Sequence, residues 1–148
     1  MAEKLKLTCL DCAQVNAVPA EKLASGPKCG VCGAALMPAK PSVVDFDTLQ
    51  KAARNDDVPL LVDFWAPWCG PCRSMAPEFE KAAAMLKGEI RLAKIDTQQF
   101  PDASAKWNIR GIPALIAFRK GREVTRAAGA RPAQAIADFA RQAMGRQG

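Results

Sequence analysis

The chain has 148 residues, of which 49% are hydrophobic and 24% charged, a balance that excludes an intrinsically disordered protein. It contains no histidine, which excludes Ser-His and Cys-His nucleophilic catalysis and every metal site that needs imidazole. The formal net charge is +6, but no basic run is longer than "RKGR" at 119–122, so a solvated basic surface is favoured over nucleic-acid binding. No apolar run reaches the roughly 20 residues of a membrane-spanning helix. The start "MAEKLKLTCLDC" lacks the apolar core of a secretory signal, so we expect a cytoplasmic protein that does not bind membranes.

The first 33 residues are rich in cysteine and contain no aromatic side chain. A segment this short buries too little apolar surface to fold without an added constraint. Cys9, Cys12, Cys29 and Cys32 have the spacing C-x2-C-x16-C-x2-C, in which two tight turns can direct four sulfurs to one metal ion. We therefore expect residues 1–33 to form a small module that resembles a zinc ribbon and holds one structural zinc ion. Two redox disulfides, or four free thiols, are the alternatives.

Residues 34–42, "AALMPAKPS", combine prolines with small residues and are expected to form a moderately stiff linker. Over residues 43–148, short apolar runs alternate with helical periodicity, which predicts an α/β domain with a mixed sheet covered by helices on both faces. Asp45 is expected to cap the first helix, Pro77 to kink the second and Gly88 to end it. The expected elements are helix 46–54, strand 59–65, helix 72–87, strand 90–95, helix 101–107, a hairpin over 114–128 turning at Lys120-Gly121, and a final helix that opens at Pro132 and buries Ile136, Phe139, Ala140 and Ala143.

The third pair of cysteines, Cys69 and Cys72, lies between an apolar strand and an amphipathic helix. Cys69 precedes the first turn of that helix, where unpaired backbone N–H groups favour a thiolate over a thiol. Cys72 follows one turn later, close enough for a disulfide. No further ligand is spaced to complete a metal site in this part of the chain, so this pair is expected to react rather than to hold a metal.

The motif "WCGPC" at 68–72, preceded by "LVDFWAPW", resembles the active-site motif of the thioredoxin family. The resemblance extends over residues 43–148 and includes "RGIPALIAF" at 110–118 and the glycine of "AAGAR" at 127–131. The additional four-cysteine module resembles the zinc-containing branch of that family, thioredoxin 2. The resemblance implies a thioredoxin fold and a cytoplasmic protein-disulfide reductase, which is recharged by thioredoxin reductase with NADPH. Disulfide-containing proteins are then the expected substrates, and no bound organic cofactor is expected.

The resemblance also implies a role for individual residues. Cys69 is expected to attack a substrate disulfide, and Cys72 to resolve the mixed disulfide that results. Asp63, an acid within the apolar run "LLVDFW", is expected to be buried, to relay the proton of Cys72 and to have Lys94 as its charge partner; the alternative is a solvent-facing Asp63. Pro113 is expected to be cis, which leaves the backbone before it free to pair with a bound peptide. The expected docking surface around Cys69 consists of Trp68, Gly70, Pro71, Ile112, Pro113 and Gly129.

Two other functions compete with this hypothesis. A disulfide-forming oxidase would use the same chemistry, but Gly70-Pro71 matches the pair between the cysteines of the reducing thioredoxins. A zinc-ribbon module that recruits partners, with the larger domain as its scaffold, belongs to another class. Trp65 and Trp107 are assigned to packing, and Ala114 differs from the threonine that the family often has after the cis proline.

Overall fold

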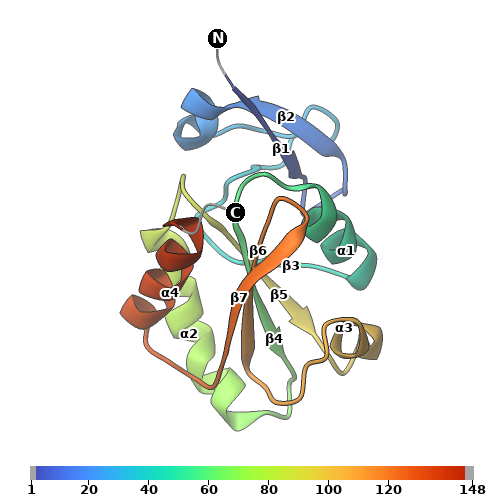
Figure 1. Cartoon of the computed structure of the whole chain (residues 1–148), viewed down its shortest axis with the longest axis vertical. Helices are drawn as coiled ribbons and strands as arrows, with labels where there is room; N and C mark the ends of the chain where they lie inside the picture. Colours follow the sequence, from blue (N-terminus) through green and yellow to red (C-terminus); the bar gives the residue numbers. More distant parts are fainter. Residues whose placement is uncertain (1–2, 146–148) are drawn as a thin grey trace.

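A computed structural model describes residues 3–145; the outermost residues of the predicted domains, 1–2 and 146–148, lie outside this range. The described part forms a small N-terminal module and a larger α/β domain (Figure 1). In the module, β1 (Lys4–Thr8) pairs antiparallel with β2 (Val15–Pro19), and a 3-10 helix, η1 (Ala20–Ser25), follows. The α/β domain consists of β3 (Ser42–Val43), α1 (Phe46–Asn55), β4 (Leu60–Trp65), α2 (Gly70–Met85), β5 (Arg91–Asp96), α3 (Pro101–Lys106), β6 (Ala114–Arg119), β7 (Arg122–Ala128) and α4 (Ala133–Gly145).

The larger sheet has the strand order β3-β5-β4-β6-β7. β3, β5 and β4 are parallel, whereas β6 is antiparallel to β4 and β7 to β6. α2 and α4 pack on one face and α1 and α3 on the other, so alternate strand positions fill two separate cores (Figure 1). The predicted mixed sheet flanked by helices is confirmed.

The predicted elements lie close to the observed ones, and their ends have identifiable causes. Asp45 caps α1, since its Oδ1 accepts the backbone N–H of Thr48 at 2.8 Å. α2 begins at Gly70, earlier than predicted, because Cys69 is its N-cap, and it continues through Pro77. Lys120 and Gly121 both have positive φ, 54° and 82°, as a two-residue hairpin turn requires. In α4, Ile136, Ala140 and Ala143 are buried as predicted, but Phe139 is only half-buried and the unpredicted Ala137 is fully buried.

A buried ion pair within the larger domain, which the sequence did not reveal, is hydrogen-bonded to the N-terminal module. Arg91, at the start of β5, pairs with Asp56, and both side chains are at most 2% exposed. The other Arg91 terminal nitrogen donates to the carbonyl of Thr8 at 2.7 Å, and Asp56 Oδ1 accepts the Thr8 backbone N–H at 2.7 Å. Strand β1 of the module is therefore hydrogen-bonded to charged groups of the larger domain.

Part of the predicted linker also contributes to this junction. Leu36 and Met37 are buried in one cluster with Leu7, Cys9 and Val58. The boundaries of the predicted linker stay a prediction, but these two side chains pack as core residues.

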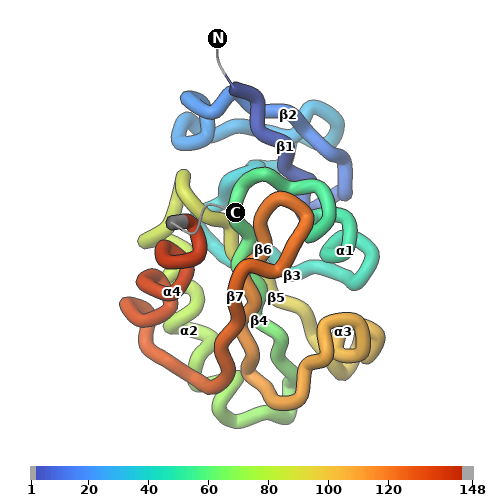
Figure 2. The backbone as a smooth tube through the Cα atoms, viewed as in Figure 1, coloured from blue at the N-terminus to red at the C-terminus, as the bar shows by residue number. Residues whose placement is uncertain are grey.

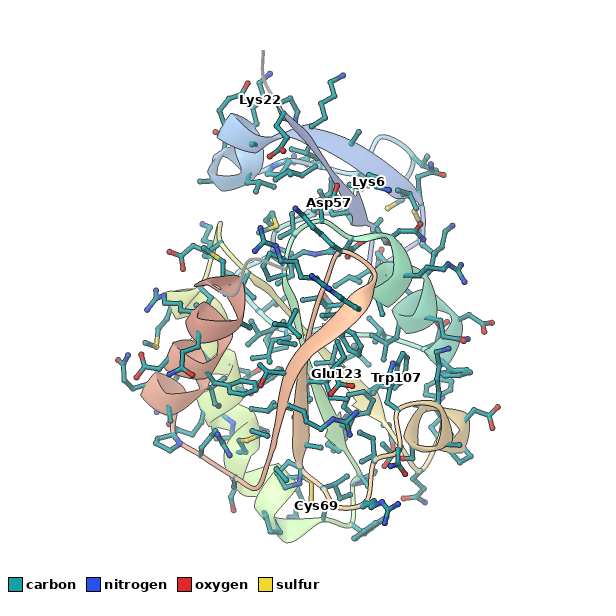
Figure 3. All side chains as sticks on the ribbon, viewed as in Figure 1. Lys6, Lys22, Asp57, Cys69, Trp107 and Glu123 are labelled. Atoms are coloured by element: carbon teal, nitrogen blue, oxygen red, sulfur yellow. A yellow bond between two sulfur atoms is a disulfide. The ribbon has the colours of Figure 1, made fainter. Side chains whose placement is uncertain are left out.

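The module lies at the end of the larger sheet that is opposite the reactive cysteine pair. Figure 2 shows the N-terminal strands above the β6–β7 turn, and Figure 3 shows Lys6 and Asp57 at one end of the molecule and Cys69 at the other. Lys6 and Asp57 are themselves joined by hydrogen bonds across the junction. Among residues 3–145, none of the helices has both the length and the apolar character that crossing a bilayer requires.

Candidate functional site

Cys69 and Cys72 form a disulfide at the N-terminus of α2, directly after β4. Their Cα atoms are 5.3 Å apart, and the Cys72 backbone N–H donates to Cys69 Sγ at 3.2 Å. Cys69 is 4% exposed and Cys72 is 2% exposed, whereas the neighbouring Trp68 is 70% exposed. The pair thus lies just below a surface that presents a large apolar side chain.

The loop before β6 faces Cys69. The Ile112–Pro113 bond is cis, as expected, and the Ile112 carbonyl oxygen is 3.8 Å from Cys69 Sγ. Gly129, with a φ of 97°, donates its N–H to the Pro113 carbonyl at 2.9 Å and so joins the end of β7 to this loop. Of the six expected docking residues, Trp68, Gly70, Pro71 and Gly129 are exposed, Ile112 is half-buried and Pro113 is buried.

Asp63 is fully buried on β4, so the solvent-facing alternative is wrong. Neither of its carboxylate oxygens has a hydrogen-bond partner. Burial raises the pKa of Asp63 from 3.8 to about 7, and the positive charge of Lys94 offsets this only in part. Lys94 lies opposite Asp63 in the parallel pairing of β4 and β5, and its Nζ is 4.7 Å from the centre of the Trp65 ring.

The four cysteines of the N-terminal module come together from two turns. Their Sγ atoms all lie within 4.8 Å of one another, with 3.6 Å between Cys9 and Cys32 and 3.7 Å between Cys12 and Cys29. Tetrahedral zinc with sulfur bonds of about 2.3 Å places its ligands roughly 3.8 Å apart, so the spacing fits that ion. Four cysteine sulfurs are also the donor set of a closed, structural zinc site.

Neighbouring N–H groups point toward one of these sulfurs. The Val31 backbone N–H lies 3.4 Å from Cys29 Sγ, and the side-chain amide of Asn16 lies 3.5 Å from it. Hydrogen bonding from the Cys32 and Val31 backbones lowers the pKa of the Cys29 thiol to about 6. Asn16 also accepts the Gly30 backbone N–H at 3.0 Å and so holds β2 against the second turn. The role of Asn16 could not be predicted from the sequence, because a single asparagine on a strand belongs to no spaced motif.

Trp65 and Trp107 differ in how they pack. Trp107 has edge contacts with Phe46, Phe64 and Phe118, which confirms its role in packing. Trp65 is half-buried under Lys94, with no hydrogen-bond partner for its ring nitrogen. Because side chains alternate along a strand, Trp65 lies on the same face of β4 as Asp63.

A disulfide at a helix start, beside a cis-proline loop and near a buried carboxylate on a mixed sheet, defines a thiol–disulfide oxidoreductase. Residues 40–142 match the family model described as thioredoxin, and residues 8–34 match the model described as the N-terminal region of thioredoxin 2. The chain therefore belongs to the thioredoxin family, with the zinc-ribbon module of its thioredoxin 2 branch, and is a protein disulfide oxidoreductase.

Relatives and solved structures agree with this assignment. Thioredoxin C-3 of Corynebacterium nephridii is 43% identical over 124 residues, which are 84% of this chain and 85% of that protein. Thioredoxin 1 of Nostoc sp. is 42% identical over 96 residues, 65% of this chain and 89% of that relative. The crystal structure of chloroplastic thioredoxin z superposes with a TM-score of 0.65 at 32% identity, covering 72% of this chain and 96% of the other.

Proposed function

We propose that the protein reduces disulfide bonds in other proteins through Cys69 and Cys72. In the reduced enzyme, the Cys69 thiolate attacks one sulfur of the substrate disulfide, and the other substrate sulfur leaves as a thiolate. Cys72 then attacks Cys69, the second substrate sulfur leaves, and the Cys69–Cys72 disulfide forms. Two electrons pass from the enzyme to the substrate, which leaves the enzyme in the disulfide form described above. The position of Cys69 at the N-cap of α2 supports its role as nucleophile, because backbone N–H groups there stabilise a thiolate.

Asp63 is proposed to accept the proton of Cys72 when that buried thiol attacks. A carboxyl with a pKa of about 7 can exchange a proton at neutral pH, which an exposed aspartate cannot do efficiently. Its lack of hydrogen-bond partners supports this role, since no other group of the described chain holds its oxygens. Lys94 is proposed to keep the pKa from rising further.

Substrate docking is proposed to involve Trp68, Gly70, Pro71, Ile112, Pro113 and Gly129. The exposed Trp68 ring supports this role, because it offers an apolar surface to another polypeptide. Gly70 and Gly129 are exposed and have no side chain, so they allow that polypeptide to approach Cys69 closely. The backbone at Ile112, which faces Cys69 Sγ, is proposed to pair with the substrate as an added strand.

Cys9, Cys12, Cys29 and Cys32 are proposed to hold one zinc ion as thiolates. A closed set of four ligands leaves no open position for catalysis, so the ion would supply folding energy to the module. Recharging by thioredoxin reductase with NADPH, and a cytoplasmic location, are proposed from the family membership alone.

The single observation that supports reduction best is the disulfide between Cys69 and Cys72 at the cis-proline loop. The protein should accelerate the precipitation of insulin by dithiothreitol, and Cys69→Ser should abolish the acceleration. With NADPH and thioredoxin reductase in place of dithiothreitol, NADPH consumption should continue beyond one equivalent of the protein only when insulin is present. An active Cys69→Ser variant would exclude this mechanism, and activity in dithiothreitol but not with the reductase would exclude the proposed recharging.

A further inference from the structure

The excess positive charge of the chain is concentrated in one segment. Residues 106–131 contain seven of the 21 lysines and arginines but only one of the 15 acidic residues. This segment alone therefore has a formal charge of +6, equal to that of the whole chain. In sequence the basic residues look scattered, but the fold brings several of them to one side of the β6–β7 hairpin.

Several of these side chains line two adjoining hollows on the surface. The first, of about 380 Å³, is lined by Trp107 together with Arg54, Lys106 and Arg122. The second, of about 390 Å³, is lined by residues 108–111, which include Arg110, and by the end of β7. Arg126 connects the two hollows. It lines the second hollow, and it donates hydrogen bonds to the Trp107 carbonyl and to the Glu123 carboxylate, two residues that line the first hollow. Figure 3 shows Trp107 and Glu123 near each other on this side of the molecule. We name the two hollows together the basic groove, with Arg54, Lys106, Trp107, Arg110, Arg122 and Arg126 as its defining residues.

Most of the positive charge in the basic groove is unneutralised. Of the ion pairs within residues 3–144, only that of Arg126 with Glu123 belongs to the groove. Arg54, Lys106, Arg110 and Arg122 are exposed, and in the described part of the chain no carboxylate lies within ion-pair distance of them. Lys106 extends over the Trp107 ring, with 5.7 Å from Nζ to the ring centre. Three of these cations line the hollow that contains Trp107, and Arg110 lines the adjoining hollow. A surface of this charge is complementary to an acidic polypeptide.

The basic groove leads to the redox site. Gly111, at one end, precedes Ile112, whose carbonyl faces Cys69. Ala128, on the other side of that end, pairs with Ala114 and precedes Gly129. The seven residues of β7 span roughly 20 Å, which matches about six residues of an extended peptide.

We propose that the basic groove binds an acidic stretch of the substrate protein, adjacent in sequence to the disulfide that Cys69 attacks. This inference rests on the proposed function and adds to it a class of preferred substrate. Complementary charge raises the rate of encounter and aligns the substrate before the sulfur atoms meet, and both effects weaken as salt screens the charges.

The test uses pre-reduced full-length protein and two fluorescence-quenched peptide disulfides in stopped flow. The peptides are identical except for a tail of about six residues beside the cysteine, either all glutamate or all glutamine, a length set by the span of β7. At low salt the glutamate-tailed peptide should react at least about fivefold faster, and at roughly 1 M salt, where the screening length is about 3 Å, the two rates should converge. The variant Arg54→Gln/Lys106→Gln/Arg122→Gln should bring the ratio of the two rates to about 1. A matched control, Lys4→Gln/Lys22→Gln/Lys87→Gln, removes the same charge from exposed positions outside the groove and should keep the ratio.

Three results would overturn the inference. One is an equal rate for the two tails at low salt, with both peptides reduced, which leaves the proposed function intact. Another is an equal loss of preference in the control variant, which would assign the effect to net charge. The third is groove-dependent binding of a short fluorescent oligonucleotide without any preference for the glutamate tail. If neither peptide is reduced at all, the proposed function fails as well.

Discussion

Two buried aspartates show how the same side chain serves different purposes in this chain. Asp56 is held by Arg91 and by the Thr8 backbone N–H. Asp63 is equally buried but accepts no hydrogen bond, and its pKa is raised to about 7. An unpaired buried carboxylate destabilises the folded state. We therefore interpret Asp63 as a residue retained for proton transfer at the expense of stability.

Asp63→Asn should stabilise the oxidised protein, and the gain should increase with pH. Because the folded-state pKa of about 7 lies above the ordinary 3.8, folding favours the neutral carboxyl, and stability is lost as pH rises from 3.8 through about 7. From about pH 5.5 to about pH 8.5, the advantage of the asparagine variant should grow by about 2 kcal/mol in guanidinium unfolding. The exposed Asp102 offers a matched control, since Asp102→Asn should show no such growth. A wild-type protein that instead gains stability over the variant with rising pH would contradict the burial argument.

At the scale of elements, the N-terminal module contains the cluster of four cysteines and also forms the junction with the larger domain. β1 and β2 form only a two-stranded sheet, which is marginally stable in water without further support. The cysteine cluster supplies support from within, and the Arg91–Asp56 pair supplies it from the larger domain. Because the junction lies at the opposite end of the sheet from Cys69, the module does not form part of the redox site (Figure 3).

Cys29→Ser should lose zinc and unfold the module while the larger domain stays folded. The reduced wild-type protein should contain about one zinc per chain, because metal coordination supplies the folding energy of small metal-bound modules. Zinc content by atomic emission and hydrogen exchange by mass spectrometry measure the two effects. Protection should fall over β1 and β2 but persist in β4. Full zinc occupancy in the variant would show that the ligand assignment is wrong.

Breaking the buried ion pair should be costly. Asp56→Ala leaves the Arg91 guanidinium buried without its partner and should lower the free energy of unfolding by about 3–5 kcal/mol. In a double-mutant cycle with Arg91→Ala, the interaction energy should be about 1–3 kcal/mol. Lys81→Ala breaks the surface pair with Glu78, in which Lys81 is 67% exposed, and should cost less than about 1 kcal/mol. Equal effects of Asp56→Ala and Lys81→Ala would show that the buried pair contributes no more to stability than an exposed one.

Across the whole molecule, the sequence was most informative where a short local pattern is compatible with only one local structure. Asp45 before a helical period, Lys120-Gly121 between two apolar runs and the paired C-x2-C units each specify their local structure, and each was predicted correctly. Contacts between distant segments had no such signal. Arg91 and Asp56 are separated by 35 residues, and Thr8 is 48 residues from Asp56.

A charged residue inside an apolar run indicates a buried charge, but this pattern led to a prediction for only one of the two buried charges that show it. Asp63 in "LLVDFW" was recognised as buried, whereas Arg91 in "IRLAKI" follows the same pattern and was not. The basic groove was missed for a related reason, because Arg54 and Arg122 meet only when α1 packs beside the β6–β7 hairpin. Sequence spacing therefore identified the reacting cysteines but not the surface that leads to them.

Trapping the mixed disulfide tests the reduction of substrate disulfides by Cys69 directly. Cys72→Ser, reduced and mixed with insulin, should form a covalent adduct through Cys69 that dithiothreitol releases, because no resolving thiol remains to displace the substrate. Intact-mass and peptide mass spectrometry would locate the bond, with Cys69→Ser as the control. We expect an adduct on Cys69 in the first variant and none in the second. Adducts of equal yield in both variants, or bonds to Cys12 or Cys32 instead of Cys69, would contradict this expectation.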